Sequence, residues 1–133
     1  MFCRIIRGEA EAYIVYEDDD VVAFLDKYPV SRGHTLVVPK EHYPHIYEVP
    51  DRLLAKLVLV ARDIARAQVR ALGATGVRIV QNNGSDAGQV IFHVHFHVIP
   101  FYGPCRFLRY HLGREEGEEV SNALRRELRS IRS

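Results

Sequence analysis

Three histidines alternate with apolar residues in the stretch "HVHFHVIP", which runs from His93 to Pro100. Side chains on a β-strand point alternately to its two faces, and the strand rises about 3.3 Å per residue. His93, His95 and His97 are therefore expected to share one face at spacings of about 6.6 Å. Phe92, Val94, Phe96 and Val98 are expected on the other face, packed against apolar material, with the histidine face turned toward a cleft.

Three interpretations of the histidines compete. A hydrogen-bonded polar stripe is the plainest, but three imidazoles in register are a costly way to build one. A zinc site is the second, because His-x-His on a strand can supply two ligands, with a third from elsewhere. Imidazole catalysis is the third, in which one histidine is a nucleophile while its neighbours position it and handle protons. The periodicity of the strand does not separate the second from the third.

The loop before the histidines favours phosphate as the ligand. Asn82, Ser85, Gly88 and Gln89 lie one short loop upstream of His93. Glycines let the backbone approach a ligand closely. Neutral hydrogen-bond donors beside imidazoles suit phosphate oxygens better than they suit the completion of a metal coordination sphere.

Short β-rich runs predict an antiparallel sheet that carries these residues. The first two runs flank the acidic turn "DDD" and read as a hairpin, and the third run ends at Pro39. The expected strands cover residues 13–18, 21–26, 34–40, 77–82 and 91–99.

Two helices are expected outside the sheet. Apolar residues recur at helical spacing between residues 51 and 72, with Asp51 as the N-cap and Gly73 as the stop. A last helix has an apolar stripe made of Val120, Leu124, Leu128 and Ile131. The sum is an α+β domain: an antiparallel sheet, one long helix packed on it, and an added C-terminal helix. The expected division is a domain at 1–110 and a helical extension at 111–133, packed on the domain or on a dimer.

Size, charge and composition limit the classes of function. The 133 residues suffice for one domain with a real core. A net charge of +1 provides no basic field for nucleic acid, so no nucleic-acid partner is expected. No apolar run suits a signal peptide or a membrane span, so a cytoplasmic protein without membrane contact is expected. Two cysteines, Cys3 and Cys105, are too few for a disulfide framework and fit a reducing compartment.

Five blocks of the sequence resemble one known family. "HVHFHVI" fits the His-x-His-x-His-x-x signature of the histidine triad (HIT) nucleotide hydrolases and transferases. Four further blocks resemble the Hint-like phosphoramidase branch, in order and at matching spacing: "FCRIIRGE", "YEDDDVVAFLD", "GHTLVVPKEH" and "NNGSDAGQ". The resemblance spans roughly residues 2–100. It implies a HIT-like α+β fold, a homodimer, and hydrolysis or transfer at the α-phosphorus of a nucleotide.

The resemblance also implies roles for four histidines. His95 matches the nucleophile that becomes nucleotidylated. A neutral imidazole attacks through one nitrogen while the other donates to an acceptor, expected here to be the backbone carbonyl of His93. His97 matches the residue that contacts the phosphate and the scissile oxygen. His93 supports the orientation of the nucleophile, and His34 matches a fourth histidine that lines the site.

A nucleotide-binding surface is implied in the same way. Asp26 matches the carboxylate that accepts both ribose hydroxyls, a geometry that two carboxylate oxygens suit well. The other residues form an apolar slot for the base and a phosphate loop. They are Phe2, Ile5, Phe24, Leu25 and Leu36 for the slot, and Asn82, Gly88 and Gln89 for the loop. Each apolar residue of the slot is also a credible core residue.

Three features depart from the Hint-like pattern. Val90 stands where that branch has a serine that contacts the phosphate or the leaving-group nitrogen. The chain after Ile99 lacks the branch's short ending with its tryptophan and adds a helix instead. Many bacterial and archaeal relatives carry Cys-x-x-Cys with two histidines as a structural zinc site. Here only Cys3, His42 and His93 are candidates, an incomplete set, so no zinc and no required cofactor are expected.

The sequence thus predicts a HIT-family hydrolase that acts on purine nucleotide conjugates of the AMP-phosphoramidate type through a nucleotidyl-His95 intermediate. A dinucleoside polyphosphate hydrolase of the same family is the first alternative, which Val90 and the altered C-terminus leave open. A zinc hydrolase that uses His93, His95 and a third ligand belongs to another class. A nucleotide-binding regulator with negligible turnover is the last, and the intact triad speaks against it.

Overall fold

The computed structural model describes residues 2–104 and 109–132. Cys105 lies outside these residues. The elements, in chain order, are α1 (Phe2–Ile6), β1 (Ile14–Glu17), β2 (Val21–Leu25), β3 (Thr35–Pro39), η1 (Ile46–Glu48), α2 (Asp51–Leu72), β4 (Gly76–Gln81), η2 (Ser85–Ala87), β5 (Phe96–Phe101) and α3 (Arg114–Arg132). Among the described helices, none is both long and apolar enough to cross a membrane.

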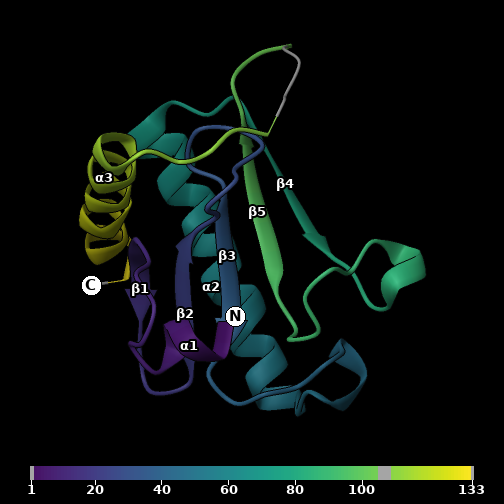
Figure 1. Cartoon of the computed structure of the whole chain (residues 1–133). Helices are drawn as coiled ribbons and strands as arrows, with labels where there is room; N and C mark the ends of the chain where they lie inside the picture. Colours follow the sequence, from purple (N-terminus) through teal and green to yellow (C-terminus); the bar gives the residue numbers. More distant parts are fainter. Residues whose placement is uncertain (1, 105–108, 133) are drawn as a thin grey trace.

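The five strands within the described residues form one antiparallel sheet in the order β1-β2-β3-β5-β4. Helix α2 covers one face of the sheet, and the short α1 lies on the other (Figure 1). The predicted α+β class, with one long helix on an antiparallel sheet, is confirmed. The hairpin β1–β2 forms around the acidic turn, where Asp18 accepts hydrogen bonds from the backbone N–H groups of Asp20 and Val21.

Alternation along the strands divides the apolar residues between the two faces. The larger cluster lies between the sheet and α2 and includes Val37, Val94 and Val98. A smaller cluster on the opposite face contains Phe2, Val22, Phe24, Leu36 and Val38. The face that carries this smaller cluster is also the face on which His97 lies, as the strand register described below shows.

Helix α2 matches the predicted bounds, but its first residue has a different role from the predicted one. Asp51 is the first helical residue and Pro50 is the N-cap, because Leu54 donates its N–H to the Pro50 carbonyl. Asp51 instead places a negative charge in the first turn, where the helix dipole favours it. Gly73 ends the helix as predicted, at φ 75°, a left-handed conformation that suits glycine.

The predicted bounds of the strand that carries the histidines are wrong. It begins at Phe96 and continues through Pro100 to Phe101, so His93 and His95 precede it. The chain before Phe96 bonds elsewhere: Val94 donates its N–H to the carbonyl of Tyr43 at 2.7 Å. Phe92 is 47% exposed and does not pack against the core as expected, whereas Val94, Phe96 and Val98 do.

Helix α3 packs on its own chain, beside β1 and α2 (Figure 1). Its stripe residues Val120, Leu124 and Leu128 are buried in the larger cluster. At its C-terminal end, the Arg132 guanidinium donates to Asp63 of α2 at 2.5 Å and lies over the ring of Tyr16.

Leu124→Ala is expected to lower the free energy of unfolding by about 2–5 kcal/mol, because it removes a fully buried side chain between α3 and the sheet. Urea denaturation measures this, with the exposed neighbour variant Arg125→Ala as the control. A cost below about 1 kcal/mol would contradict the packing of α3 described above.

Candidate active site

His97 lies in a row of residues that crosses the sheet on the face opposite α2. Phe24 of β2 pairs with Leu36 of β3, and Leu36 pairs with His97 of β5. Directly paired residues on antiparallel strands point to the same face. The row therefore places an imidazole beside an apolar surface that belongs to the smaller cluster.

His95 is held by the backbone of the segment that carries it. Its Nδ1 lies 2.8 Å from the carbonyl oxygen of His93. A carbonyl oxygen only accepts, so Nδ1 carries the ring proton and donates it. In the neutral ring this leaves the lone pair on Nε2, the nitrogen that is then able to attack an electrophile. The predicted acceptor for His95 is confirmed.

His34 and His97 form a second pair of linked imidazoles. The backbone N–H of Val30 donates to Nδ1 of His34 at 3.0 Å, which places the proton of the neutral ring on Nε2. That Nε2 lies 2.9 Å from Nδ1 of His97 and donates to it. The proton of His97 is thereby left on Nε2, so His97 offers a donor while His95 offers a lone pair.

Burial keeps these rings neutral. Burial lowers the pKa of His95 and His34 below the ordinary value of 6.5, and it lowers the pKa of His97 to about 4. Asp26 opposes these shifts but does not overcome burial. Because His34 is neutral at pH 7, its 3.6 Å contact with Asp26 is not an ion pair.

The family model for the HIT domain matches residues 7–103. The chain belongs to the HIT family. A hypothetical histidine triad nucleotide-binding protein of Sulfolobus tokodaii has a crystal structure with a TM-score of 0.92 and 38% identity, covering 98% of this chain and 93% of that one. A Zn-bound histidine triad family protein of Mycobacterium smegmatis matches with a TM-score of 0.88 and 36% identity, covering 98% and 94%.

One relative has a named activity. Adenylylsulfatase HINT3 of Arabidopsis thaliana is 45% identical over 100 residues, which make up 75% of this chain and 51% of that protein. Members of the HIT family are in general nucleotide hydrolases or transferases. In this HIT protein a neutral imidazole with a free Nε2 lone pair, His95, lies beside an imidazole donor, His97, with ring centroids 4.9 Å apart.

Asp26 follows β2 and joins the imidazoles. Its Oδ1 accepts from the backbone N–H of Tyr28 at 2.9 Å, and its Oδ2 faces Nε2 of His34. Only 14% of its side chain is exposed. The carboxylate is therefore held in one orientation at the edge of the histidine cluster.

Four of the five residues expected to form the base slot lie together, and one does not. Phe2, Phe24 and Leu36 belong to the smaller cluster, and Ile5 packs against it. The Phe2 ring contacts the ring of His95 edge-on at a centroid distance of 5.1 Å. Leu25 alternates with Phe24 along β2 and belongs instead to the cluster under α2, so its assignment to the slot is wrong.

The loop after β4 is braced by one of its own predicted phosphate ligands. The Gln89 side chain is 3% exposed; its Oε1 accepts from Gly84 N–H, and its Nε2 donates to the carbonyls of Pro44 and Ile91. Gly88 adopts φ 94° beside the amide of Asn82. Val90, which replaces the serine of the Hint-like branch, is 85% exposed.

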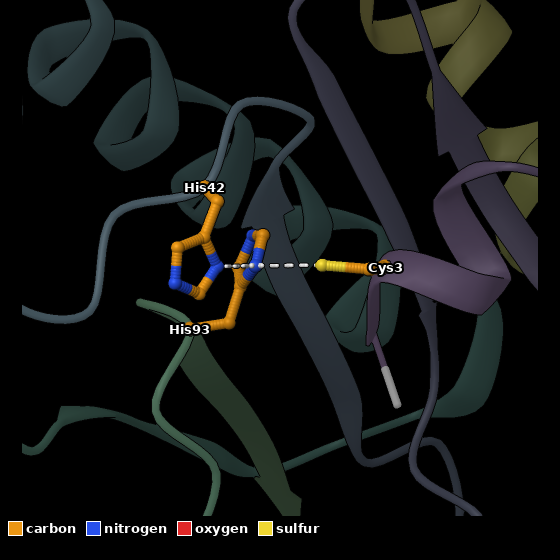
Figure 2. Close-up of side chains that lie close together, drawn as sticks. All are labelled: Cys3, His42 and His93. Carbon is orange, nitrogen blue, oxygen red and sulfur yellow. Dashed lines mark hydrogen bonds between the residues drawn. The ribbon is translucent and has the colours of Figure 1, made fainter.

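Cys3, His42 and His93 converge from three segments of the chain (Figure 2). Nε2 of His93 donates to the Pro39 carbonyl at 2.8 Å, which leaves its Nδ1 free to accept. This Nδ1 lies 3.1 Å from Nδ1 of His42 and 3.9 Å from Sγ of Cys3. Tetrahedral zinc separates nitrogen ligands by about 3.3 Å, and nitrogen from sulfur by about 3.6 Å. The three donors thus fit three of the four positions, and no fourth donor joins them among the described residues.

Two contributors to the site were not expected from the sequence. Arg109, from the segment after β5, lies 3.4 Å from Asp26 Oδ2. Asn83 accepts from the N–H of Ile46 at 2.7 Å and exchanges hydrogen bonds with Gln81, which ties the loop after β4 to η1. No local pattern marks either residue, because Asp26 and Ile46, the partners that they tie to the site, lie far away in the sequence.

Two hollows among the described residues lie away from the histidines. One of about 760 Å³ lies between β1 and α3, and one of about 410 Å³ lies between α2 and β4. The expected cleft in front of the histidines is not one of these two, and the Phe2 ring lies edge-on against the rings of His93 and His95.

Nitrogen-15 NMR of the histidine rings is expected to show the proton of His95 on Nδ1 and the protons of His34 and His97 on Nε2. Because burial lowers their pKa, these rings should take up protons only below pH 6.5, with His97 titrating near pH 4. Unfolded histidines take up protons from pH 6.5 downward, so thermal stability should fall as the pH drops from about 6.5 to 4. A His97 that titrates near 6.5 would contradict this arrangement.

Proposed function

We propose that this HIT protein hydrolyses purine nucleotide conjugates at the α-phosphorus, through a covalent nucleotidyl-His95 intermediate. The single observation that carries the proposal is the hydrogen bond from His95 Nδ1 to the His93 carbonyl, which presents Nε2 as a lone pair. An adenosine 5′-phosphoramidate is the substrate class proposed first. A dinucleoside polyphosphate remains the alternative, because the exposed Val90 offers no hydroxyl to a leaving-group nitrogen.

The first step forms a bond between His95 Nε2 and the α-phosphorus as the bond to the leaving group breaks. His97 Nε2 supplies the hydrogen bond to the leaving atom. An anionic phosphate beside His97 raises the pKa of its ring, so Nδ1 takes up a proton from solvent when substrate binds and its hydrogen bond from His34 opens. The resulting imidazolium protonates the leaving group through Nε2 and becomes neutral. In the second step neutral His97 accepts a proton from water, which attacks the phosphorus and releases His95.

The remaining residues bind and orient the nucleotide. Asp26 is proposed to accept the ribose hydroxyls, and the cluster of Phe2, Phe24 and Leu36 is proposed to hold the base. Asn82 and the backbone around Gly88 are proposed to donate to the non-bridging phosphate oxygens. The proposed role of Gln89 is to brace this loop, since its side-chain amide is already engaged by three backbone groups.

A metal is not required for these steps. If zinc binds, Cys3, His42 and His93 would hold it, and the ion would tie α1 to the segment before β5. Its contribution would be structural, because Nε2 of His95 is a separate atom that the three donors do not include.

His95→Ala is expected to lower kcat/KM by at least about 10³-fold, because it removes the nucleophile. The measurement is a rapid quench of chelator-treated protein with adenosine 5′-phosphoramidate and, separately, a diadenosine polyphosphate, followed by peptide mass spectrometry. The wild type should carry a nucleotidyl group on His95, and the faster substrate identifies the leaving-group class. His45→Ala is the matched control. Loss of all turnover in chelator, restored by zinc, would instead favour a metal-dependent hydrolase.

We also propose that the protein is a homodimer that pairs through α2 and β4. β4 is an edge strand, and apolar side chains of this region are exposed, with Val58 at 48%, Val69 at 48% and Ile79 at 47%. The hollow between α2 and β4 is lined by Ala65, Val69, Val77 and three arginines. Such apolar exposure is typical of an interaction surface.

Light scattering at micromolar concentration is expected to give twice the chain mass of 15.3 kDa. Ile79→Asp should shift the protein toward the monomer, because it places a charge in the interface. Tyr47→Asp, at a residue that is 75% exposed on η1, should leave the mass unchanged. A wild type that remains a monomer at 100 µM would be evidence against the dimer.

A further inference from the structure

Residues 109–112, which come after β5 in the chain, lie against the loop that carries Asp26. Leu112 donates its N–H to the Lys27 carbonyl at 2.8 Å, and Tyr110 donates to the Pro29 carbonyl at 3.4 Å. The Leu112 side chain is 6% exposed and belongs to the main core. This arm, residues 109–112, is therefore anchored by both its backbone and a buried side chain.

The arm places the guanidinium of Arg109 on the carboxylate of Asp26. Nη1 of Arg109 donates to the Tyr28 carbonyl and lies 3.4 Å from Asp26 Oδ2. The other carboxylate oxygen, Oδ1, accepts from the N–H of Tyr28. Both oxygens of Asp26 thus have a donor from protein, and these donors fix the plane of the carboxylate.

The pair of Arg109 and Asp26 is poorly suited to a role in folding. The Arg109 side chain is 52% exposed, and ion pairs that contact solvent contribute little to stability. The pair is well suited to orienting the Asp26 carboxylate, because a planar guanidinium holds a carboxylate more rigidly than a flexible ammonium does. Each carboxylate oxygen has two lone-pair positions, so the held carboxylate retains acceptor capacity for a ligand.

The positive charge of Arg109 also affects how an anionic nucleotide binds beside Asp26. Asp26 Oδ2 lies 3.6 Å from His34, which donates to His97, so its negative charge faces the region where the phosphate is proposed to bind. The buried imidazoles are neutral and do not offset this charge. Arg109 does offset it, which favours an anionic ligand beside the carboxylate.

We propose that Arg109 is a positioning residue that sets the sugar specificity of the site, by holding Asp26 in the plane that receives both ribose hydroxyls. The inference rests on the proposed function, in which Asp26 binds the ribose. It assigns to the arm after β5 a part in substrate selection. The substrate class it favours is a ribonucleotide over the corresponding 2′-deoxyribonucleotide.

The test compares kcat/KM for adenosine 5′-phosphoramidate with that for its 2′-deoxy counterpart. Loss of one hydrogen bond to a charged acceptor should make the wild type prefer the ribonucleotide by roughly tenfold or more. Arg109→Ala should reduce this ratio at least threefold, mainly through KM, while the melting temperature stays close to that of the wild type. Arg109→Lys should recover part of the ratio. The control Arg114→Ala, which removes an 86% exposed arginine of α3, should keep the wild-type ratio.

Asp26→Asn separates failure of this inference from failure of the proposed function. A wild type that cleaves neither compound, or an Asp26→Asn variant that keeps the full ratio, would overturn the proposed nucleotide site itself. Loss of the ratio in Asp26→Asn with retention in Arg109→Ala would overturn only the role of Arg109. Loss of the ratio in both variants, with partial rescue by lysine, is the expected result.

Discussion

The burial of several neutral imidazoles side by side is the constraint on which the site depends. A buried ring that cannot be charged has one donor and one acceptor, and each needs a partner. The backbone supplies three of these partners: the carbonyls of Pro39 and His93 accept, and the N–H of Val30 donates. Because each backbone group can only donate or only accept, it decides which ring nitrogen carries the proton. The fold thereby distributes opposite roles to His95 and His97, although both are the same residue type in nearly the same environment.

The main hydrophobic core and the histidine cluster lie on opposite faces of the sheet. One face is covered by α2 and contains most of the buried aliphatic residues. The other has only a small apolar cluster, beside which the imidazoles and Asp26 lie. Gln68 links the two layers, because its amide Nε2 donates to the carbonyls of Gly33 and Val98 from the α2 side. Helix α2 thus fixes β5 and the residues just before β3, the two segments in which His97 and His34 lie.

Much of this arrangement could be predicted from the sequence, because it depends on local patterns. Apolar spacing and the terminal Gly73 suffice to predict α2. Alternation and turn residues suffice for β1 to β4, whose bounds each differ by at most one residue from the expected ranges. The same patterns fail where bonding is not periodic. The alternation from Phe92 to Val98 suggests one strand, yet β3 pairs with β5 only as far as Phe96, and the chain before it bonds to Tyr43. The assignment of Leu25 to the base slot followed the family match, which does not show that Leu25 and its neighbour Phe24 point to opposite faces of the sheet. Arg109 left no signal at all, since its target lies 83 positions earlier in the chain.

The ends of the chain lie in very different surroundings. Phe2 begins α1 and its ring lies against His93 and His95, whereas α3 ends beside β1, on the far side of the sheet from β5 (Figure 1). A purification tag or fluorescent label joined ahead of Phe2 would therefore be attached next to a ring that contacts His95, and the same addition joined after α3 would not. An addition after α3 therefore leaves the surroundings of the histidines as they are.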